Sequence, residues 1–297
     1  MGIFSQGFYL GRGGMTAKKL SPKKLVGRLA AVLLGFFIIL LAAGYFFRER
    51  LVFYPAKGLN LTVANAGWDF EEVWLPGTGG ARINGWYLPG PPDRYTVLLL
   101  HGNSGNLENM IGRVMTYHRL KLGVLAIDYQ GFGLSEGEST LESAVLNSRA
   151  ALDFLLRKNI PPEMIAVHGF SLGGGVAGQL VAQTPEVRRP LIMDSTFTSL
   201  AAAGRDQRAF LGPLAGLILG QAYDSEKVLR IYRPEVLISL HSPQDEVVPY
   251  FLGRELFDSY QGGPKFWTDL RGGHNDYIIN QDLYENALIQ GLGLTFN

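Results

Sequence analysis

The chain has 297 residues, which is long enough for one large α/β domain and too short for two of ordinary size. Its 27 Lys and Arg residues nearly balance its 26 Asp and Glu residues, and basic patches of the globular part are not interleaved with aromatic residues, so we expect no nucleic-acid partner. The absence of cysteine excludes disulfides, thiolate nucleophiles and cysteine-ligated zinc.

The first 47 residues differ in composition from the rest of the chain. Residues 1–28 form a basic tail, and residues 29–47 (LAAVLLGFFIILLAAGYFF) contain no charged side chain. This apolar run approaches the roughly 20 residues that a helix needs to cross a bilayer. We therefore predict a single transmembrane helix over 29–47, with the lipid bilayer as a partner. A buried core helix and a cleaved signal peptide, with the cleavage site in Ala42-Ala43-Gly44, are the alternatives.

Basic residues are more frequent before the apolar run than after it. Those before it are Arg12, Lys18, Lys19, Lys23, Lys24 and Arg28, and those after it are Arg48, Arg50 and Lys57. Positive charge favours the cytoplasmic side, so the N-terminus should be cytoplasmic and the rest of the chain periplasmic, lumenal or extracellular. No acidic residue precedes Glu49, which leaves an organelle transit segment open if the source is eukaryotic.

The remainder of the chain is expected to be a connector over residues 48–69 and one α/β domain over residues 70–297. Apolar runs of strand length alternate there with helical patterns, at 95–101, 124–129, 165–168, 191–194, 236–241 and 266–270. This alternation predicts a mostly parallel sheet covered by helices on both faces. Two further runs, 70–75 and 83–88, flank the sequence PGTGG and predict an antiparallel hairpin at one edge.

A candidate nucleophile lies in the sequence HGFSLGGG, where Gly169-Phe170-Ser171-Leu172-Gly173 fits the pattern G-x-S-x-G. The pattern matters when a strand runs into a sharp turn and then a helix, which lifts the hydroxyl above the sheet edge. Residues 164–168 read as such a strand and residues 176–183 as such a helix. The alternative interpretation is a plain glycine-rich turn. A serine hydroxyl also needs a base, and a third group that orients the base.

The base and the acid are sought after Ser171, because the order along such a chain is serine, acid, histidine. His274 is the histidine that follows every plausible acid, and Gly272 and Gly273 free the backbone before it. Asp245, in the loop SPQDEVVP, is our candidate acid. Asp194, at another strand end, is the alternative acid, although it could instead bind backbone groups beside Ser195 and Thr196. Asp128 precedes the serine and is expected to hold its own glycine-rich turn.

A developing oxyanion needs hydrogen-bond donors near the serine. The backbone N–H of Leu172, at a helix N-terminus, is one candidate, and the loop HGNSGN supplies the other. We expect that second donor at Asn103, with Ser104 as the alternative. No metalloprotease motif such as H-E-x-x-H occurs in the sequence, so we expect neither a metal nor an organic cofactor.

The motifs HGNSGN, DYQGFGLSEG, GFSLGG, DSTFTS, SPQDEVVP and GGHND occur in that order. In order and spacing the chain from Leu51 onward resembles the membrane-anchored α/β-hydrolase-domain proteins related to serine aminopeptidase-like hydrolases, whose relatives include protein depalmitoylases and lysophospholipases. The resemblance implies an α/β-hydrolase fold and a triad of Ser171, Asp245 and His274. It says little about the substrate.

These observations predict a serine hydrolase that cleaves an ester or thioester, with an acyl or lipid-derived substrate expected, through an acyl-enzyme on Ser171. A peptidase with the same triad is one alternative, and a non-catalytic, membrane-tethered binding protein is another. The apolar stretch 210–219 lies in the insertion after Asp194. It is either a helix packed on the sheet or a lid that lines an acyl pocket or touches the bilayer. The lid interpretation predicts a preference for medium or longer acyl chains over acetyl.

Overall fold

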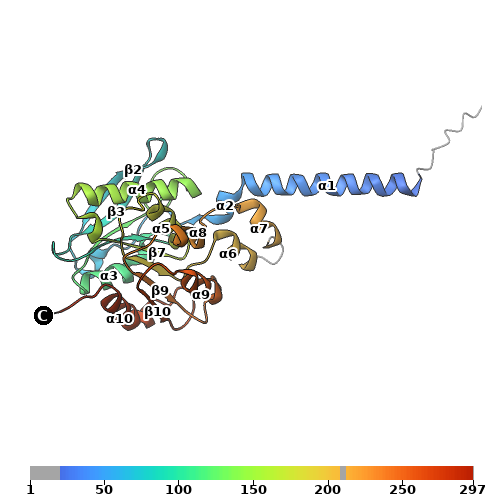
Figure 1. Cartoon of the computed structure of the whole chain (residues 1–297). Coiled ribbons are helices and arrows are strands. Elements are labelled where there is room, and N and C mark those ends of the chain that lie inside the picture. The colour runs from blue at the N-terminus through green and yellow to red at the C-terminus, as the bar shows by residue number, and fades with distance from the viewer. Residues whose placement is uncertain (1–20, 208–211, 297) are drawn as a thin grey trace, which may run out of the picture. The chain divides into compact units, whose positions relative to one another are not determined.

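The computed structural model describes residues 21–207 and 212–296. It divides the chain into two compact units, Met1–Ala43 and Gly44–Asn297. Helix α1 (Pro22–Phe46) is 25 residues long, has a mean hydropathy of 2.5 over its most apolar stretch, and buries none of its side chains (Figure 1). By length and composition it can cross a membrane. The helix begins before the expected span of 29–47, because the basic residues of the tail continue the helical turn from Pro22, a residue that suits the first helical position.

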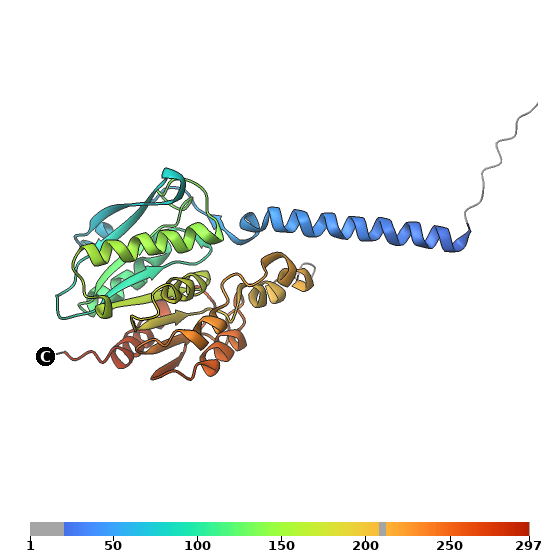
Figure 2. The same cartoon turned by 45° about the horizontal axis from the view of Figure 1, so that its top comes forward.

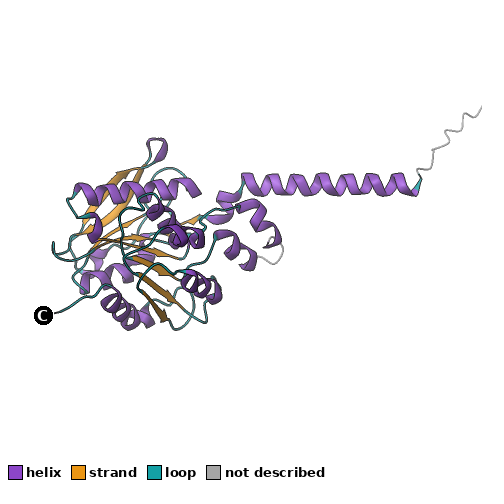
Figure 3. Ribbon diagram, viewed as in Figure 1, coloured by secondary structure: helices purple, strands orange, loops and turns teal. Residues whose placement is uncertain are grey.

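The second unit is built on one sheet of eight strands in the order β10-β9-β8-β7-β4-β6-β3-β2. Strands β6, β4, β7, β8, β9 and β10, which are consecutive in the sheet, run parallel, whereas β3 is antiparallel to both β6 and β2. Figure 3 shows the strands in orange among the purple helices. Their bounds are β2 Glu71–Pro76, β3 Arg82–Leu88, β4 Thr96–Leu100, β6 Gly123–Ile127, β7 Ile165–Phe170, β8 Leu191–Asp194, β9 Leu237–His241 and β10 Lys265–Asp269. The predicted parallel sheet and its edge hairpin are both confirmed.

Helices cover both faces of this sheet, and each face carries its own apolar core. Along β4, Leu98 and Leu100 belong to one core and Val97 and Leu99 to the other, because successive strand side chains point to opposite faces. One core takes side chains from α4 (Leu141–Arg157), α5 (Leu172–Ala182), α8 (Ser225–Ile231) and α9 (Tyr250–Ser259), and the other takes them from α3 (Ile111–Arg119) and α10 (Gln281–Gly291). The expected cover on both faces is confirmed.

The segment 48–69 is packed into the domain and is not a simple connector, which corrects our expectation. It contains helix α2 (Arg48–Val52), strand β1 (Tyr54–Pro55) and a short 3-10 helix, Val63–Ala66. Strand β1 pairs in parallel with β5 (Ser104–Gly105), and Val52, Phe53 and Val63 are buried. These elements are too short to show a helical or strand period, so the sequence pattern did not predict them.

Between β8 and α8 the chain leaves the sheet and forms α6 (Leu200–Gln207) and α7 (Gly212–Leu219). Both helices, drawn in amber in Figure 2, stand beyond the edge of the sheet instead of covering a face. Four further short 3-10 helices complete the described elements, at Thr78–Gly80, Leu107–Met110, Pro162–Met164 and Ile278–Asn280.

Candidate active site

Ser171 lies at the sharp turn between β7 and α5, where its backbone has φ 54° and ψ −121°. A non-glycine residue in this region is strained, and the surrounding contacts must hold it there. Strand and helix approach so closely that a Cβ on Gly169 would lie 2.2 Å from the carbonyl oxygen of Gly173. The helix starts at Leu172, before the expected Val176, because the glycine run after the serine is itself helical.

The end of the neighbouring strand β8 braces this turn. The N–H of Ser171 donates to the carbonyl oxygen of Asp194 at 2.8 Å, and the hydroxyl of Thr196 donates to the carbonyl oxygen of Ser171 at 2.9 Å. On the other side, a Cβ on Gly102 would lie 3.3 Å from the Cβ of Ser171, so the loop after β4 passes directly beside the serine. The conformation of Ser171 is therefore determined by backbone contacts on both sides.

Asp245 and His274 meet at the ends of β9 and β10. The Nδ1 of His274 lies 2.7 Å from Oδ2 of Asp245, while Oδ1 of Asp245 accepts from the N–H groups of Val247 and Val248 at 2.9 and 2.7 Å. Burial alone would raise the pKa of Asp245, but hydrogen bonds from His241 and His274 outweigh it and hold that pKa well below its usual range. An ionised carboxylate can only accept in this contact, so Nδ1 of His274 donates to Oδ2 of Asp245 and Nε2 is the ring nitrogen directed to other partners.

Phe170 connects this pair to the serine. Its ring lies 4.9 Å from the imidazole of His274, centroid to centroid, with 31° between the planes. Phe170 directly precedes Ser171, so the residue before the candidate nucleophile packs on the candidate base. The N–H of His274 donates to Oε2 of Glu246 at 3.1 Å, which fixes the backbone of the histidine loop as well.

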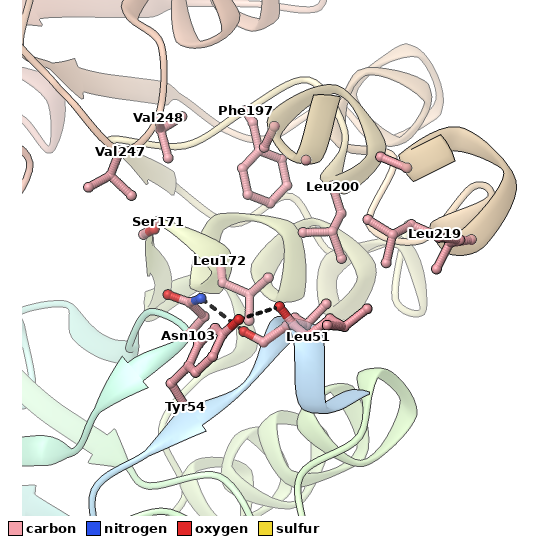
Figure 4. Close-up of a pocket in the computed structure, with 15 residues that line it drawn as sticks. Leu51, Tyr54, Asn103, Ser171, Leu172, Phe197, Leu200, Leu219, Val247 and Val248 are labelled. Atoms are coloured by element: carbon pink, nitrogen blue, oxygen red, sulfur yellow. Dashed lines mark hydrogen bonds between the residues drawn. The ribbon is translucent and has the colours of Figure 1, made fainter. Parts of the chain in front are cut away.

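The two candidate oxyanion donors, Leu172 and Asn103, line the same cavity as Ser171 (Figure 4). Leu172 is the first residue of α5, where backbone N–H groups have no partner within the helix. The side-chain amide of Asn103 donates to the carbonyl oxygen of Val52 at 2.8 Å, and the main-chain carbonyl oxygen of Asn103 accepts from the N–H of Tyr54. The side chain is thus used to hold the loop, which leaves the backbone N–H of Asn103 as the group that could bind an oxyanion.

The cavity has a volume of about 120 Å³ and a mostly apolar wall. Figure 4 shows Ser171 at one end, with side chains from α5, α6, α7 and the Asp245 loop around the space. These include Leu172, Phe197, Leu200, Leu219, Val247 and Val248. Of the apolar stretch 210–219, residues 210 and 211 lie outside the described residues; the rest forms α7, in which Ala215, Ile218 and Leu219 line the cavity and Leu217 is 64% exposed.

Asp194, our alternative acid, has other partners. Its Oδ2 accepts from Nε of Arg113 at 2.8 Å and from the hydroxyl of Tyr284 at 2.7 Å, and it lies 3.3 Å from Nε2 of His168. Our expectation that it binds backbone groups beside Ser195 and Thr196 was therefore wrong. Arg113 belongs to a helix far from Asp194 in the sequence, and no local pattern pairs the two.

Asp128 contacts its own glycine-rich turn, as expected, because its main-chain oxygen accepts from the hydroxyl of Ser135 at 2.8 Å. Its carboxylate also accepts from the N–H of Leu107 at 2.9 Å, in the segment after β5, which the sequence did not predict. Among the residues that the structure describes, no group of three or more His, Asp or Glu side chains is arranged to hold a metal ion.

Comparisons with known proteins agree with this fold. The family model described as alpha/beta hydrolase fold matches residues 95–231. An uncharacterized protein of Mycobacterium tuberculosis, Rv2307c, is 31% identical over 237 residues, covering 77% of this chain and 81% of that protein. The alpha/beta hydrolase domain-containing protein WAV2 of Arabidopsis thaliana is 30% identical, covering 71% of this chain and 75% of that protein. The chain therefore belongs to the α/β-hydrolase family.

Solved structures share the fold at low sequence identity. An alpha-beta hydrolase from Vibrio vulnificus superposes with a TM-score of 0.65 at 23% identity, covering 77% of this chain and 83% of that one. The esterase Pf2001 of Pyrococcus furiosus gives a TM-score of 0.63 at 18% identity, covering 82% of this chain and 98% of that one. At such identities the likeness concerns the fold alone.

Proposed function

We propose that the protein is a membrane-anchored serine hydrolase that cleaves an ester or thioester through an acyl-enzyme on Ser171. The observation that carries the proposal is the hydrogen bond between His274 and Asp245, 2.7 Å long, beside a serine held in a strained strand-to-helix turn. A serine nucleophile needs a base, and the base needs a carboxylate that orients it. Ser171 follows β7, while Asp245 and His274 follow the adjacent strands β9 and β10 of the same sheet.

The reaction proceeds in two halves. Nε2 of His274 takes the proton of the Ser171 hydroxyl while Oγ bonds to the acyl carbon, and the resulting oxyanion accepts hydrogen bonds from the N–H groups of Leu172 and Asn103. The tetrahedral intermediate collapses, and His274 returns the proton to the departing alcohol or thiol. A water molecule then repeats the sequence on the acyl-enzyme and releases the carboxylic acid. No step calls for a metal or an organic cofactor.

The substrate proposed for this site carries an apolar acyl chain. The wall beside Ser171 consists of aliphatic and aromatic side chains, and burying each methylene against such a wall contributes about 0.8 kcal/mol. The catalytic efficiency kcat/KM should therefore rise several-fold per methylene until the cavity is full. This supports lipid-derived esters or thioesters ahead of soluble sugar esters.

Fluorophosphonate labelling of the purified protein tests the nucleophile. The wild type should label at Ser171, and Ser171→Ala should lose both labelling and ester turnover. Ser195→Ala is the matched control, because Ser195 is also buried, follows the next strand and has a positive φ of 48°. Asp245→Asn should lower kcat by about 10³–10⁴-fold, as loss of the orienting carboxylate does in serine triads. Full activity in Ser171→Ala would refute the proposal.

The ester assignment is tested against its two alternatives with the same preparation. A peptidase would use the same triad, so matched ester and amide substrates of one acyl group separate the two activities. A non-catalytic binding protein would show no Ser171-dependent turnover on short-chain nitrophenyl esters. We expect turnover of the esters and little of the amides.

A further inference from the structure

Arg113 is a buried arginine that the proposed mechanism does not use. It lies in α3, it is 4% exposed, and its Nε donates to Oδ2 of Asp194 at 2.8 Å while Nη2 donates to the hydroxyl of Tyr284 at 3.0 Å. Burial alone would raise the pKa of Asp194, but the charge of Arg113 outweighs it and keeps that pKa well below its usual range. A buried ion pair often adds little net stability, so stability alone does not account for the pair of Arg113 and Asp194.

The guanidinium group of Arg113 also packs on three aromatic rings, those of Phe170, Tyr277 and Tyr284. Its Cζ lies 3.9 Å from the centroid of Phe170 and 5.0 Å from the centroid of Tyr277. Phe170 precedes Ser171 and packs on the imidazole of His274. Tyr277 belongs to the loop that follows His274. One planar cation thus contacts both chain segments that carry the proposed nucleophile and the proposed base.

Asp194 contacts the segment of the proposed nucleophile directly and the segment of the proposed base through Arg113. Its carbonyl oxygen accepts the N–H of Ser171, while its carboxylate fixes the guanidinium of Arg113. The guanidinium is flat, permanently charged and able to stack and donate hydrogen bonds at once, which neither lysine nor an aliphatic side chain can do. The ring of Phe170 is therefore held between a charged anchor and the imidazole of His274.

We propose that Arg113 is a positioning residue: through Phe170 and Tyr277 it sets where the ring of His274 lies relative to Ser171. The inference rests on the proposed function, because it assigns Arg113 a role only if His274 is the base. A displacement of about 1 Å in a reacting group can lower a rate by about 10²-fold, so a less firmly held His274 ring should lower kcat.

The test compares Arg113→Met and Arg113→Lys with the wild type, with each kcat expressed per site titrated by fluorophosphonate. Both variants should lower kcat by about 10- to 100-fold and leave KM within about twofold, because the acyl cavity does not include Arg113. Arg113→Lys keeps the charge opposite Asp194, so it remains informative if Arg113→Met does not fold. Phe170→Leu should reproduce the loss, and the double variant with Arg113→Lys should lose less than the product of the single losses.

Tyr117→Phe is the matched control. The Tyr117 hydroxyl hydrogen-bonds Nδ1 of His168, whose Nε2 lies 3.3 Å from Oδ2 of Asp194, so the variant removes a bond of the same network and leaves Arg113 and Phe170 in place. This variant should lose stability and keep kcat per titrated site. Wild-type kcat in Arg113→Lys, or an equal loss of kcat in Tyr117→Phe, would overturn the positioning role. If the wild type itself shows no Ser171-dependent turnover, the proposed function fails instead, so the two failures are distinguishable.

Discussion

The buried carboxyl group of Asp128 has a strongly shifted pKa. Its side chain is fully buried at the end of β6, and burial raises its pKa to about 8. His101, whose Nε2 lies 3.4 Å from Oδ1 of Asp128, is also buried, and burial lowers its pKa to about 4. Both shifts favour the uncharged forms of this pair, which lies beneath the loop that carries Asn103.

The two shifted groups predict how stability changes with pH. The contribution of Asp128 is fully present below its unfolded pKa of 3.8 and is lost as pH rises through about 8. The contribution of His101 has the opposite sign: it is present above the unfolded pKa of 6.5 and is lost as pH falls toward about 4. Between pH 6.5 and 8 the contribution of Asp128 changes more than that of His101. The free energy of unfolding should therefore fall over this range by on the order of 1–2 kcal/mol.

Urea unfolding at pH 6.5 and at pH 8 checks this prediction. The isosteric Asp128→Asn variant does not titrate and should lose most of the difference between the two pH values. Asp258→Asn, which removes an exposed carboxylate on α9, is the control and should follow the wild type. A pH dependence in Asp128→Asn as steep as that of the wild type would mean that Asp128 is not the titrating group.

Ser171, Asp245 and His274 could be proposed from sequence because each lies in a turn-rich loop directly after an apolar run. The chain order of the three, together with the position of strand ends at one sheet edge, was enough to choose among five histidines. Arg113 could not be found in this way. It sits inside a helix whose sequence, IGRVMTYHR, looks like an ordinary amphipathic one, and its partners come from β7, β8 and the C-terminal region.

Helix α7 presents different residues to the cavity and to solvent, which allows a matched pair of substitutions. Leu219 lines the cavity, whereas Leu217, on the same helix, is 64% exposed. A carboxylate at Leu219 would have to be desolvated by a long acyl chain but not by acetyl. Leu219→Asp should therefore flatten the rise of kcat/KM from acetyl to octanoyl esters while acetyl turnover persists.

Leu217→Asp is the control for that series and should keep the slope of the wild type. The measurement is kcat/KM on a homologous set of nitrophenyl esters with the detergent-solubilised protein. A flat or falling wild-type series would remove the basis for an acyl-binding role of α6 and α7, and equal slopes in the two variants would place the acyl chain elsewhere.

The segment formed by α2 and β1 contacts helix α4 and the loop that carries Asn103. Oε2 of Glu49 accepts from the N–H of Leu141 at the start of α4, and the carbonyl oxygen of Val52 accepts from Asn103. Burial of Val52 and Phe53 contributes about 1.5–3 kcal/mol each, a large part of a typical stability of 5–15 kcal/mol. The alternation of strands and helices made the sheet predictable, but such short elements carry no periodic signal.

Two truncated proteins test the contribution of this segment. One that begins at Gly44 retains α2 and β1 and should fold and label at Ser171, whereas one that begins at Gly58 should unfold at far lower urea concentration and label weakly. Circular dichroism and fluorophosphonate labelling of both proteins decide the matter. Equal stability of the two would show that residues 44–57 serve only as a connector.

At the scale of the whole molecule, the prediction concerns topology. The basic residues before the apolar run 29–47 outnumber those after it, which favours a cytoplasmic N-terminus and an exported domain. In a bacterial host, a phosphatase fused after Asn297 should be active in the periplasm, and the full chain should pellet with membranes. The protein that begins at Gly44 should stay soluble. Protection of the domain from protease added to the outside of spheroplasts would contradict this orientation.

The order of strands in the sheet has a consequence for the timing of synthesis. From β8 onward each new strand pairs with the one made just before it, and the last two strands lead into Asp245 and His274. A ribosome adding about 5–20 residues per second needs roughly 5–20 s to pass from Ser171 to His274. Throughout that interval the chain carries Ser171 without the residue proposed as its base. If His274 acts as proposed, a chain that ends before His274 should not hydrolyse esters, so hydrolysis should begin only when translation is nearly complete.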